Sequence, residues 1–166
     1  PLAVLGGKPV IERDYEQVAA FLNTVYGGTA EERIYNTAIA FGGQAVMTSP
    51  DDKSGRDGIA EAVRKINGNY DVIINIQGDE PFIQSSQIET LCECFEDSGT
   101  QIATLGKPFT SLEALQNTNS PKIILDNRGY AMYFSRSVIP FIRGAESADW
   151  LARYPFLKHI GIYAYR

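Results

Sequence analysis

The run of residues 71–77 constrains the fold more than any other part of this sequence. Its apolar side chains are nearly continuous and β-branched, as at Val72, Ile73 and Ile74, and the run stops at Gly78. Such a composition is typical of a parallel strand that is covered on both faces. Parallel strands need long and usually helical crossovers, so we expect strands and helices to alternate along the chain.

Helical and strand patterns do alternate on both sides of this run. Apolar spacings of three and four predict helices over about residues 9–25, 34–41 and 59–66, and the second is expected to end at Gly42-Gly43. Further strands are expected at 44–48, 101–105 and 159–165, with a hairpin over 122–134 that turns at Gly129. Ser86 with Glu89, and Thr110 with Glu113, have the spacing of capping boxes that begin helices.

These patterns and the length of the chain predict one domain over residues 1–166. At 166 residues with 44% apolar composition, the chain can bury one sizeable core. The predicted fold class is α/β, a three-layer α/β/α sandwich whose mostly parallel sheet is mixed because the hairpin adds antiparallel strands.

Charge and cysteine content exclude several classes of protein. The 15 Lys and Arg against 20 Asp and Glu give a net charge of −5, without the basic cluster expected for nucleic-acid binding. No apolar run approaches the ~18 residues of a membrane span. Cys92 and Cys94 are the only cysteines and His159 is the only histidine, too few for a four-ligand zinc site. We expect buried thiols in a reducing compartment, the cytoplasm.

The end of the strand at 71–77 supplies the first candidate site. Ligands of open α/β sheets bind beyond the carboxyl ends of strands, which is where Asp79 lies. A carboxylate there is suited to Mg²⁺, which prefers oxygen ligands and retains positions for phosphates. The same Gly-Asp pair also fits an ordinary turn, so both interpretations remain open.

A second candidate is the polar loop at 49–57, which includes Ser54 and Gly55 and leads into a helix. Backbone N–H groups at a helix start attract anions, yet the loop has no phosphate-loop consensus and could simply cap the helix.

A third candidate site is formed by the last predicted strand and the end of the predicted hairpin. His159 and Tyr163 are expected on one face of a strand, because side chains alternate between faces. Arg136 and Arg166 each follow a strand, where they could clamp a carboxylate or phosphate or instead cap surface carbonyls.

Four motifs in order make a more specific comparison possible. They are Asn75-Ile76-Gln77-Gly78-Asp79-Glu80-Pro81, Asn119-Ser120-Pro121-Lys122, Tyr133-Phe134-Ser135-Arg136 with Ile139-Pro140, and His159-Ile160-Gly161-Ile162-Tyr163-Ala164-Tyr165-Arg166. Together they closely resemble the 3-deoxy-manno-octulosonate (KDO) cytidylyltransferases, also called CMP-KDO synthetases, over nearly the whole chain. The resemblance is to a central portion that lacks the family's N-terminal nucleotide loop and C-terminal segment.

The resemblance implies a nucleotide-diphospho-sugar transferase-like fold and an Mg²⁺-dependent reaction of CTP with KDO. The products would be CMP-KDO and pyrophosphate, on the way to lipopolysaccharide. It implies that Asp79 is the catalytic Mg²⁺ ligand and that Gln77 lies against the nucleotide, with Ser54 and Gly55 also contacting substrate. KDO would face Arg136, His159, Tyr163 and Arg166, and the enzyme would be a cytoplasmic homodimer.

Departures from the family pattern keep other interpretations open. The family usually has Ser-Gly-Thr, an acidic residue and Arg where this chain has Ser54-Gly55-Arg56-Asp57-Gly58. Gly27-Gly28 weakens a strand interior, so that sheet edge is expected to be irregular or lost. The alternatives are an inactive, truncated or altered domain that serves as a dimerising scaffold, and a related sugar-acid nucleotidyltransferase.

Overall fold

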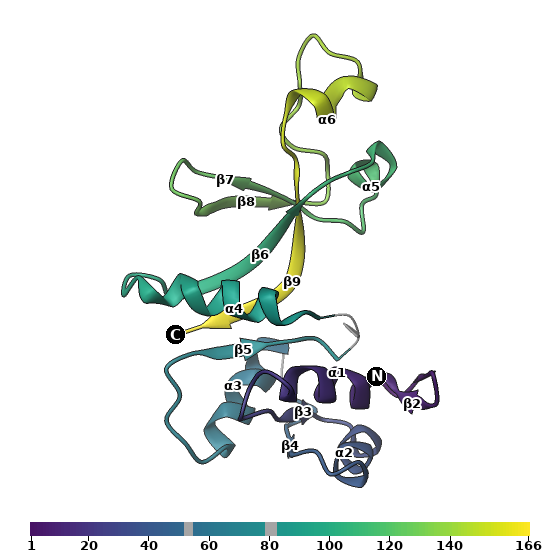
Figure 1. The fold of residues 1–166 in the computed structure, drawn as a ribbon, viewed down its shortest axis with the longest axis vertical. Coiled ribbons are helices and arrows are strands. Elements are labelled where there is room, and N and C mark those ends of the chain that lie inside the picture. Colours follow the sequence, from purple (N-terminus) through teal and green to yellow (C-terminus); the bar gives the residue numbers. More distant parts are fainter. Residues whose placement is uncertain (52–54, 79–82) are drawn as a thin grey trace. The chain divides into compact units, whose positions relative to one another are not determined.

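The computed structural model describes residues 1–51, 55–78 and 83–166, and the chain divides into two compact units. Unit 1 consists of Pro1–Ile102 and Ala164–Arg166, and unit 2 consists of Ala103–Tyr163. Both units combine helices with strands (Figure 1). The boundary between the units crosses two strands. The first residue of the strand at Ile102–Pro108 and the last two residues of the strand at Leu157–Tyr165 belong to unit 1.

Helices and strands largely alternate along the chain in both units. Unit 1 contains β1 (Val4–Leu5), β2 (Lys8–Pro9), α1 (Val10–Ala19), β3 (Gly27–Thr29), α2 (Glu32–Ala40), β4 (Ala45–Met47), α3 (Gly55–Lys65), β5 (Ile73–Asn75), α4 (Ser85–Glu93) and the 3-10 helix η1 (Cys94–Glu96). Unit 2 follows with β6 (Ile102–Pro108), α5 (Leu112–Gln116), β7 (Lys122–Leu125), β8 (Ala131–Ser135), the 3-10 helix η2 (Ser147–Asp149), α6 (Trp150–Arg153) and β9 (Leu157–Tyr165).

Unit 1 contains a parallel β–α–β element in which β3 pairs with β4 and α2 connects them. The strand expected to be irregular at Gly27-Gly28 is regular, which corrects the expectation from the sequence. A Cβ added at Gly27 would lie 3.8 Å from Cβ of Ala38 on α2, and one at Gly28 would lie 3.6 Å from Cβ of Ala62 on α3. Successive residues of a strand face opposite ways, so the glycines let a helix pack closely on each face.

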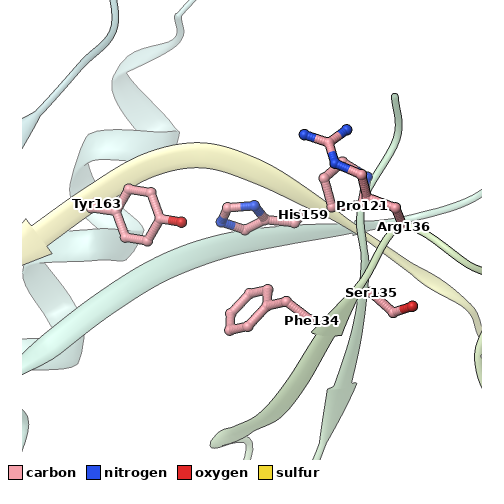
Figure 2. A pocket seen from close by; sticks show the side chains of 6 residues that line it. All are labelled: Pro121, Phe134, Ser135, Arg136, His159 and Tyr163. Atoms are coloured by element: carbon pink, nitrogen blue, oxygen red, sulfur yellow. The ribbon is translucent and has the colours of Figure 1, made fainter. Parts of the chain in front are cut away.

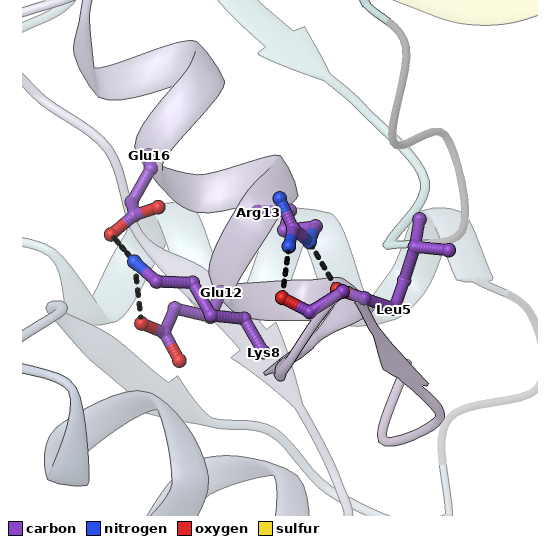
Figure 3. Close-up of polar contacts among 6 residues, drawn as sticks. Leu5, Lys8, Glu12, Arg13 and Glu16 are labelled. Atoms are coloured by element: carbon purple, nitrogen blue, oxygen red, sulfur yellow. Dashed lines mark hydrogen bonds and ion pairs between the residues drawn. The ribbon is translucent and has the colours of Figure 1, made fainter.

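The start of the chain is fastened to α1 by charged side chains (Figure 3). Arg13 donates from Nε to the carbonyl of Leu5 and from Nη2 to that of Gly6, across the turn between β1 and β2. Lys8 bridges Glu12, at 3.0 Å, and Glu16. Its hydrogen bonds with Glu16 and then Glu12 raise the pKa of the Lys8 ammonium, because both carboxylates favour its charged form. Lys8 is therefore engaged within unit 1.

Two predicted elements of unit 1 are shorter in the structure. The helix expected to reach residue 25 ends at Ala19, and the hydroxyl of Tyr15 donates to the carbonyl of Val25 at 3.1 Å. The apolar spacing continues beyond Ala19, but the chain leaves the helix in a turn and Val25 returns to pair with Tyr15. The run at 71–77 forms only Ile73–Asn75 and is half-buried rather than covered on both faces.

The predicted capping boxes are also displaced. Helix α4 is capped by Gln84, which exchanges hydrogen bonds with Gln87, instead of by Ser86 and Glu89. At α5 the hydroxyl of Ser111, and not that of Thr110, accepts from the N–H of Ala114. In each case the observed cap is the residue with extended backbone geometry immediately before the first helical turn.

Unit 2 is organised around strands β6, β9, β7 and β8. Strand β9 pairs with β6 and with β7, and β7 pairs antiparallel with both β8 and β9. The predicted hairpin is confirmed: β7 and β8 are joined through Gly129, whose φ of +86° is a left-handed conformation that glycine adopts readily. The carboxylate of Asp126 accepts from the N–H groups of Arg128 and Tyr130, and these bonds lower its pKa.

Aromatic side chains form the core of unit 2 around α5 and α6. Phe109, Leu115 and Phe156 are buried together, and Trp150 packs against them. The Trp150 ring stacks on Phe156 with centroids 6.2 Å apart and meets Phe141 edge-on at 5.4 Å. Its indole N–H donates to the carbonyl of Ala145 at 3.2 Å, so its polar atom is paired.

The two thiols are exposed, which corrects the expectation that they are buried. Cys92 at the end of α4 and Cys94 at the start of η1 are both free and exposed. Apolar helix spacing places Ile88, Leu91 and Phe95 inward instead, and these three side chains are buried. No helix within the described ranges is long and apolar enough to cross a membrane.

Candidate functional site

A cavity of about 320 Å³ lies within unit 2, where the end of the β7–β8 hairpin approaches β9. It is lined by Pro121, Phe134, Ser135, Arg136, His159 and Tyr163 (Figure 2). The lining combines a cation, an imidazole, a phenol and a hydroxyl with an aromatic wall. Such a set can bind an anionic ligand that carries several hydroxyl groups.

Strand alternation places His159 and Tyr163 together, as the sequence predicted. Their ring centroids are 5.3 Å apart, and Phe134 from β8 meets His159 edge-on at 5.0 Å. The main-chain N–H of His159 donates to the carbonyl of Pro121 at 2.9 Å, which joins β9 to the start of β7. These contacts fix the imidazole in the wall of the cavity, between the two aromatic rings (Figure 2).

Burial lowers the pKa of the His159 imidazole below its ordinary value of 6.5. The cause is desolvation, which disfavours the charged ring. At neutral pH the imidazole is therefore uncharged and can accept one hydrogen bond while it donates another. The hydroxyl of Thr104, on the neighbouring strand β6, lies 2.9 Å from Nε2.

Arg136 lines the cavity, and Lys122 holds its backbone through a hydrogen bond. The Lys122 side chain is fully buried, and Nζ donates to the carbonyls of Asn117 at 2.9 Å and Arg136 at 3.0 Å. The Arg136 side chain itself is exposed and donates from Nη1 to the carbonyl of Thr118 at 3.0 Å. Burial lowers the pKa of Lys122, because the charged ammonium has lost its water.

The second arginine of the predicted clamp lies in unit 1 with carbonyl partners of its own. Arg166 donates to the carbonyls of Phe95 at 2.8 Å, Asp97 at 3.0 Å and Thr100 at 2.9 Å. Its guanidinium also lies over the Phe95 ring, 5.4 Å from the centroid. These are the carbonyl contacts that the sequence left open as the alternative to ligand binding.

The predicted nucleotide residues belong to unit 1 or fall outside the described residues. Gln77 is exposed beyond the end of β5, and Gly55 is the exposed first residue of α3. Ser54 and Asp79 lie outside the described residues. In the part of the chain that the structure describes, no group of three or more His, Cys, Asp or Glu side chains could hold a metal ion.

Four residues near the cavity had no predicted role: Pro121, Phe134, Ser135 and Thr104. The first three belong to the motifs that carried the resemblance, and that was their only signal in the sequence. Thr104 lies outside those motifs, and 55 positions separate it from His159.

Comparisons with known proteins identify the family of this chain. A family model described as cytidylyltransferase matches residues 1–166. The 3-deoxy-manno-octulosonate cytidylyltransferase of Bacteroides thetaiotaomicron is 57% identical over 100% of this chain and 68% of the relative. The chain belongs to the KDO cytidylyltransferase family. The enzyme of the same name from Porphyromonas gingivalis is 46% identical over 100% of the chain and 66% of its own length.

Two solved structures are similar in fold to this KDO cytidylyltransferase chain. A CMP:2-keto-3-deoxy-manno-octonic acid synthetase complexed with CTP is 36% identical, with a TM-score of 0.87 over 100% of this chain and 66% of that chain. A 4-diphosphocytidyl-2C-methyl-D-erythritol synthase from Anaerococcus prevotii, 11% identical, has a TM-score of 0.57 over 98% of this chain and 61% of its own, and shows the fold alone. The predicted α/β nucleotidyltransferase fold is confirmed. The chain spans about two thirds of the length of these family members.

Proposed function

We propose that the protein transfers the cytidylyl group of CTP to KDO, forming CMP-KDO and pyrophosphate for lipopolysaccharide synthesis. In this reaction a hydroxyl oxygen of the sugar acid attacks the α-phosphorus, and the bond to the β-phosphate breaks. The observation that carries the proposal is 57% identity over the whole chain to a relative named for this reaction. A related synthetase was solved with CTP bound.

The cavity in unit 2 is proposed to hold the sugar acid. Arg136 supplies a permanent positive charge for the carboxylate, and its planar guanidinium can bind both oxygens. His159 and Tyr163 offer hydrogen bonds to hydroxyl groups, while the ring of Phe134 covers an apolar face of the sugar. This arrangement would position KDO, which matters in phosphoryl transfer because the reaction depends mainly on placement and charge neutralisation.

The nucleotide is proposed to bind along unit 1. Gln77 follows strand β5, and Ser54 with Gly55 precedes the body of α3, where a helix start favours phosphate oxygens. We retain Asp79, four residues beyond the end of β5 in the sequence, as the proposed Mg²⁺ ligand, because a carboxylate is a hard oxygen donor. Mg²⁺ bound there would neutralise phosphate charge.

Pyrophosphate release by the purified chain with CTP, KDO and Mg²⁺ tests this function. We expect release from the wild type and a loss of at least about a hundredfold in kcat/KM for Asp79→Asn. Arg136→Met should instead raise KM for KDO by about tenfold or more. Lys107→Met, which changes an exposed lysine of β6, is the matched control and should behave as wild type. A folded chain that binds CTP but releases no pyrophosphate would overturn the proposal.

A homodimer is proposed on the basis of the exposed apolar side chains of the hairpin. Met132 and Tyr133 on β8 are 67% and 64% exposed, and Tyr130 and Phe134 add further exposed aromatic area. Met132 and Tyr133 are successive residues, so large apolar side chains are exposed on both faces of β8. Exposed apolar surface of this size often marks an interface. Light scattering should give a dimer for the wild type and a monomer for Met132→Lys. Val4→Lys, at a 70% exposed position in unit 1, should remain dimeric. A monomeric wild type would contradict the assignment.

We also propose that the protein acts in the cytoplasm. The free and exposed thiols of Cys92 and Cys94 fit a reducing compartment, where such groups persist without oxidation.

A further inference from the structure

The hydroxyl of Thr104 lies at the centre of three polar contacts that together fix where its proton points. Oγ1 is 2.7 Å from the carbonyl oxygen of Ile162, 3.2 Å from that of Ile160 and 2.9 Å from Nε2 of His159. A threonine hydroxyl has one proton to donate and lone pairs with which to accept. Carbonyl oxygens can only accept, so the contacts are not equivalent.

The shortest of these contacts decides the arrangement. If the hydroxyl donated to His159, its oxygen would face the two carbonyl oxygens, one at 2.7 Å, with no proton between them. Two acceptors at that distance repel each other. The hydroxyl therefore donates to Ile162, and its oxygen accepts a proton from Nε2 of His159. This requires the Nε2–H form of the ring.

The other ring nitrogen is consequently an acceptor. A neutral imidazole has a single N–H, so a proton on Nε2 leaves a lone pair on Nδ1. Burial favours this neutral ring at pH 7. Within the described residues Nδ1 has no hydrogen-bond partner, and the ring itself lines the cavity (Figure 2).

We propose that Thr104 is a positioning residue that fixes His159 as its Nε2–H tautomer and thereby makes Nδ1 an acceptor for a hydroxyl group of the bound ligand. The cavity then has one polar group that donates hydrogen bonds and one that accepts them. Arg136 donates hydrogen bonds and requires an anionic group, whereas Nδ1 accepts and rejects one. A ligand must therefore present a carboxylate and a hydroxyl at separate points, which a sugar acid does. The identity of that ligand rests on the proposed function, whereas the tautomer does not.

Nitrogen-15 spectroscopy can test the tautomer directly, because His159 is the only histidine of the chain. Labelling histidine with 15N places the signal at one residue. In a long-range proton–nitrogen correlation above pH 7, we expect the Nε2–H pattern, with a ring proton that exchanges slowly with water. A wild-type ring with its proton on Nδ1 would overturn the proposal.

Two substitutions at Thr104 separate positioning from simple packing. Thr104→Val keeps the shape but removes the hydroxyl, so both tautomers should become populated and the Nε2 proton should exchange faster. Thr104→Ser restores the hydroxyl and should restore the wild-type spectrum. Thr110→Val, at an exposed position in the same unit, is the matched control. A valine spectrum identical to that of the wild type would refute the role of Thr104.

KDO itself supplies the second readout. Saturating KDO should shift the Nδ1 resonance of the wild type, and Thr104→Val should raise KM for KDO about fivefold with little change in kcat. A KM unchanged by the valine substitution, in an enzyme that turns over, would overturn the hydroxyl-acceptor role of Nδ1. A wild type without turnover and without a response to KDO would instead refute the proposed function, and the tautomer spectra would still decide the role of Thr104.

Discussion

The buried ammonium of Lys122 donates to the main-chain carbonyl of Arg136 at 3.0 Å, so one cation fixes the backbone that carries another. The same ammonium holds the carbonyl of Asn117 at 2.9 Å, and its stem lies beside the Phe109 ring, with Nζ 5.8 Å from the centroid. The ammonium of Lys122 thereby links the end of β8 to the segment before β7. Pro121 and Arg136, which line the cavity, lie next to these anchored positions.

Lys122→Met should therefore destabilise unit 2 by about 2 kcal/mol. Methionine fills a similar volume but leaves the carbonyls of Asn117 and Arg136 without this donor, and removal of a desolvated charge offsets only part of that loss. Urea unfolding followed by the fluorescence of Trp150 measures the change. Lys107→Met, an exposed lysine in the same unit, should change stability by less than about 0.5 kcal/mol. Equal stabilities for the two variants would refute a structural role for Lys122.

Arg166 and Arg136 should respond to methionine substitution in opposite ways. Arg166 makes three hydrogen bonds to carbonyls of unit 1, so its loss should cost about 1–2 kcal/mol of stability with little effect on KDO affinity. Arg136→Met should weaken KDO binding at nearly unchanged stability. Calorimetric titration with KDO and urea unfolding compare the two. An Arg166→Met variant that folds normally but binds KDO weakly would restore the ligand role predicted from the sequence.

His159 should make the stability of the protein fall as the pH falls below about 6.5. Burial lowers the pKa of the folded imidazole, so in that window the unfolded chain binds more protons than the folded one and acid favours unfolding. The slope declines through the ordinary pKa of 6.5 and vanishes about one pH unit above it, where the ring is neutral in both states. The difference in unfolding free energy between wild type and His159→Gln, measured from pH 5 to 7.5, should show this trend. Parallel curves for the two proteins would contradict it.

Gly129→Ala should destabilise the β7–β8 hairpin by about 1 kcal/mol. The φ of +86° at this residue places a Cβ in the left-handed region, where L-residues pay a steric cost. Space is not the cause, because an added Cβ would meet nothing within 4 Å. Gly129→Asn should cost less, since asparagine tolerates this conformation better than alanine does. Thermal unfolding of the three proteins ranks them, and an alanine variant as stable as the wild type would refute the conformational argument.

The sequence predicted those features of the structure that depend on a few neighbouring residues, such as turns, helix ends and the alternation of side chains along a strand. Gly42, with a φ of +84°, follows helix α2 as predicted, and the turn at Gly129 joins two strands as predicted. Alternation along one strand was enough to bring His159 and Tyr163 together in the cavity.

Features that depend on distant parts of the chain could not be read in this way. The cap of α4 moved from Ser86 to Gln84 because the backbone, and not the spacing of residue types, decides where a helix begins. Arg166 reaches Phe95 across 71 positions, and Thr104 reaches His159 across 55, so neither contact has a local signature. The exposure of Cys92 and Cys94 likewise follows from which face of α4 packs inward.

The chain has one tryptophan, Trp150, and it is partly buried against the aromatic core of unit 2. Its emission therefore reports on the melting of that unit alone, whereas far-ultraviolet circular dichroism sums the helices of both. The two signals together form a built-in test of cooperativity. Coincident transitions would mean that the two units unfold cooperatively, as one. Separate transitions would mean that unit 2, with its cavity, unfolds independently of unit 1.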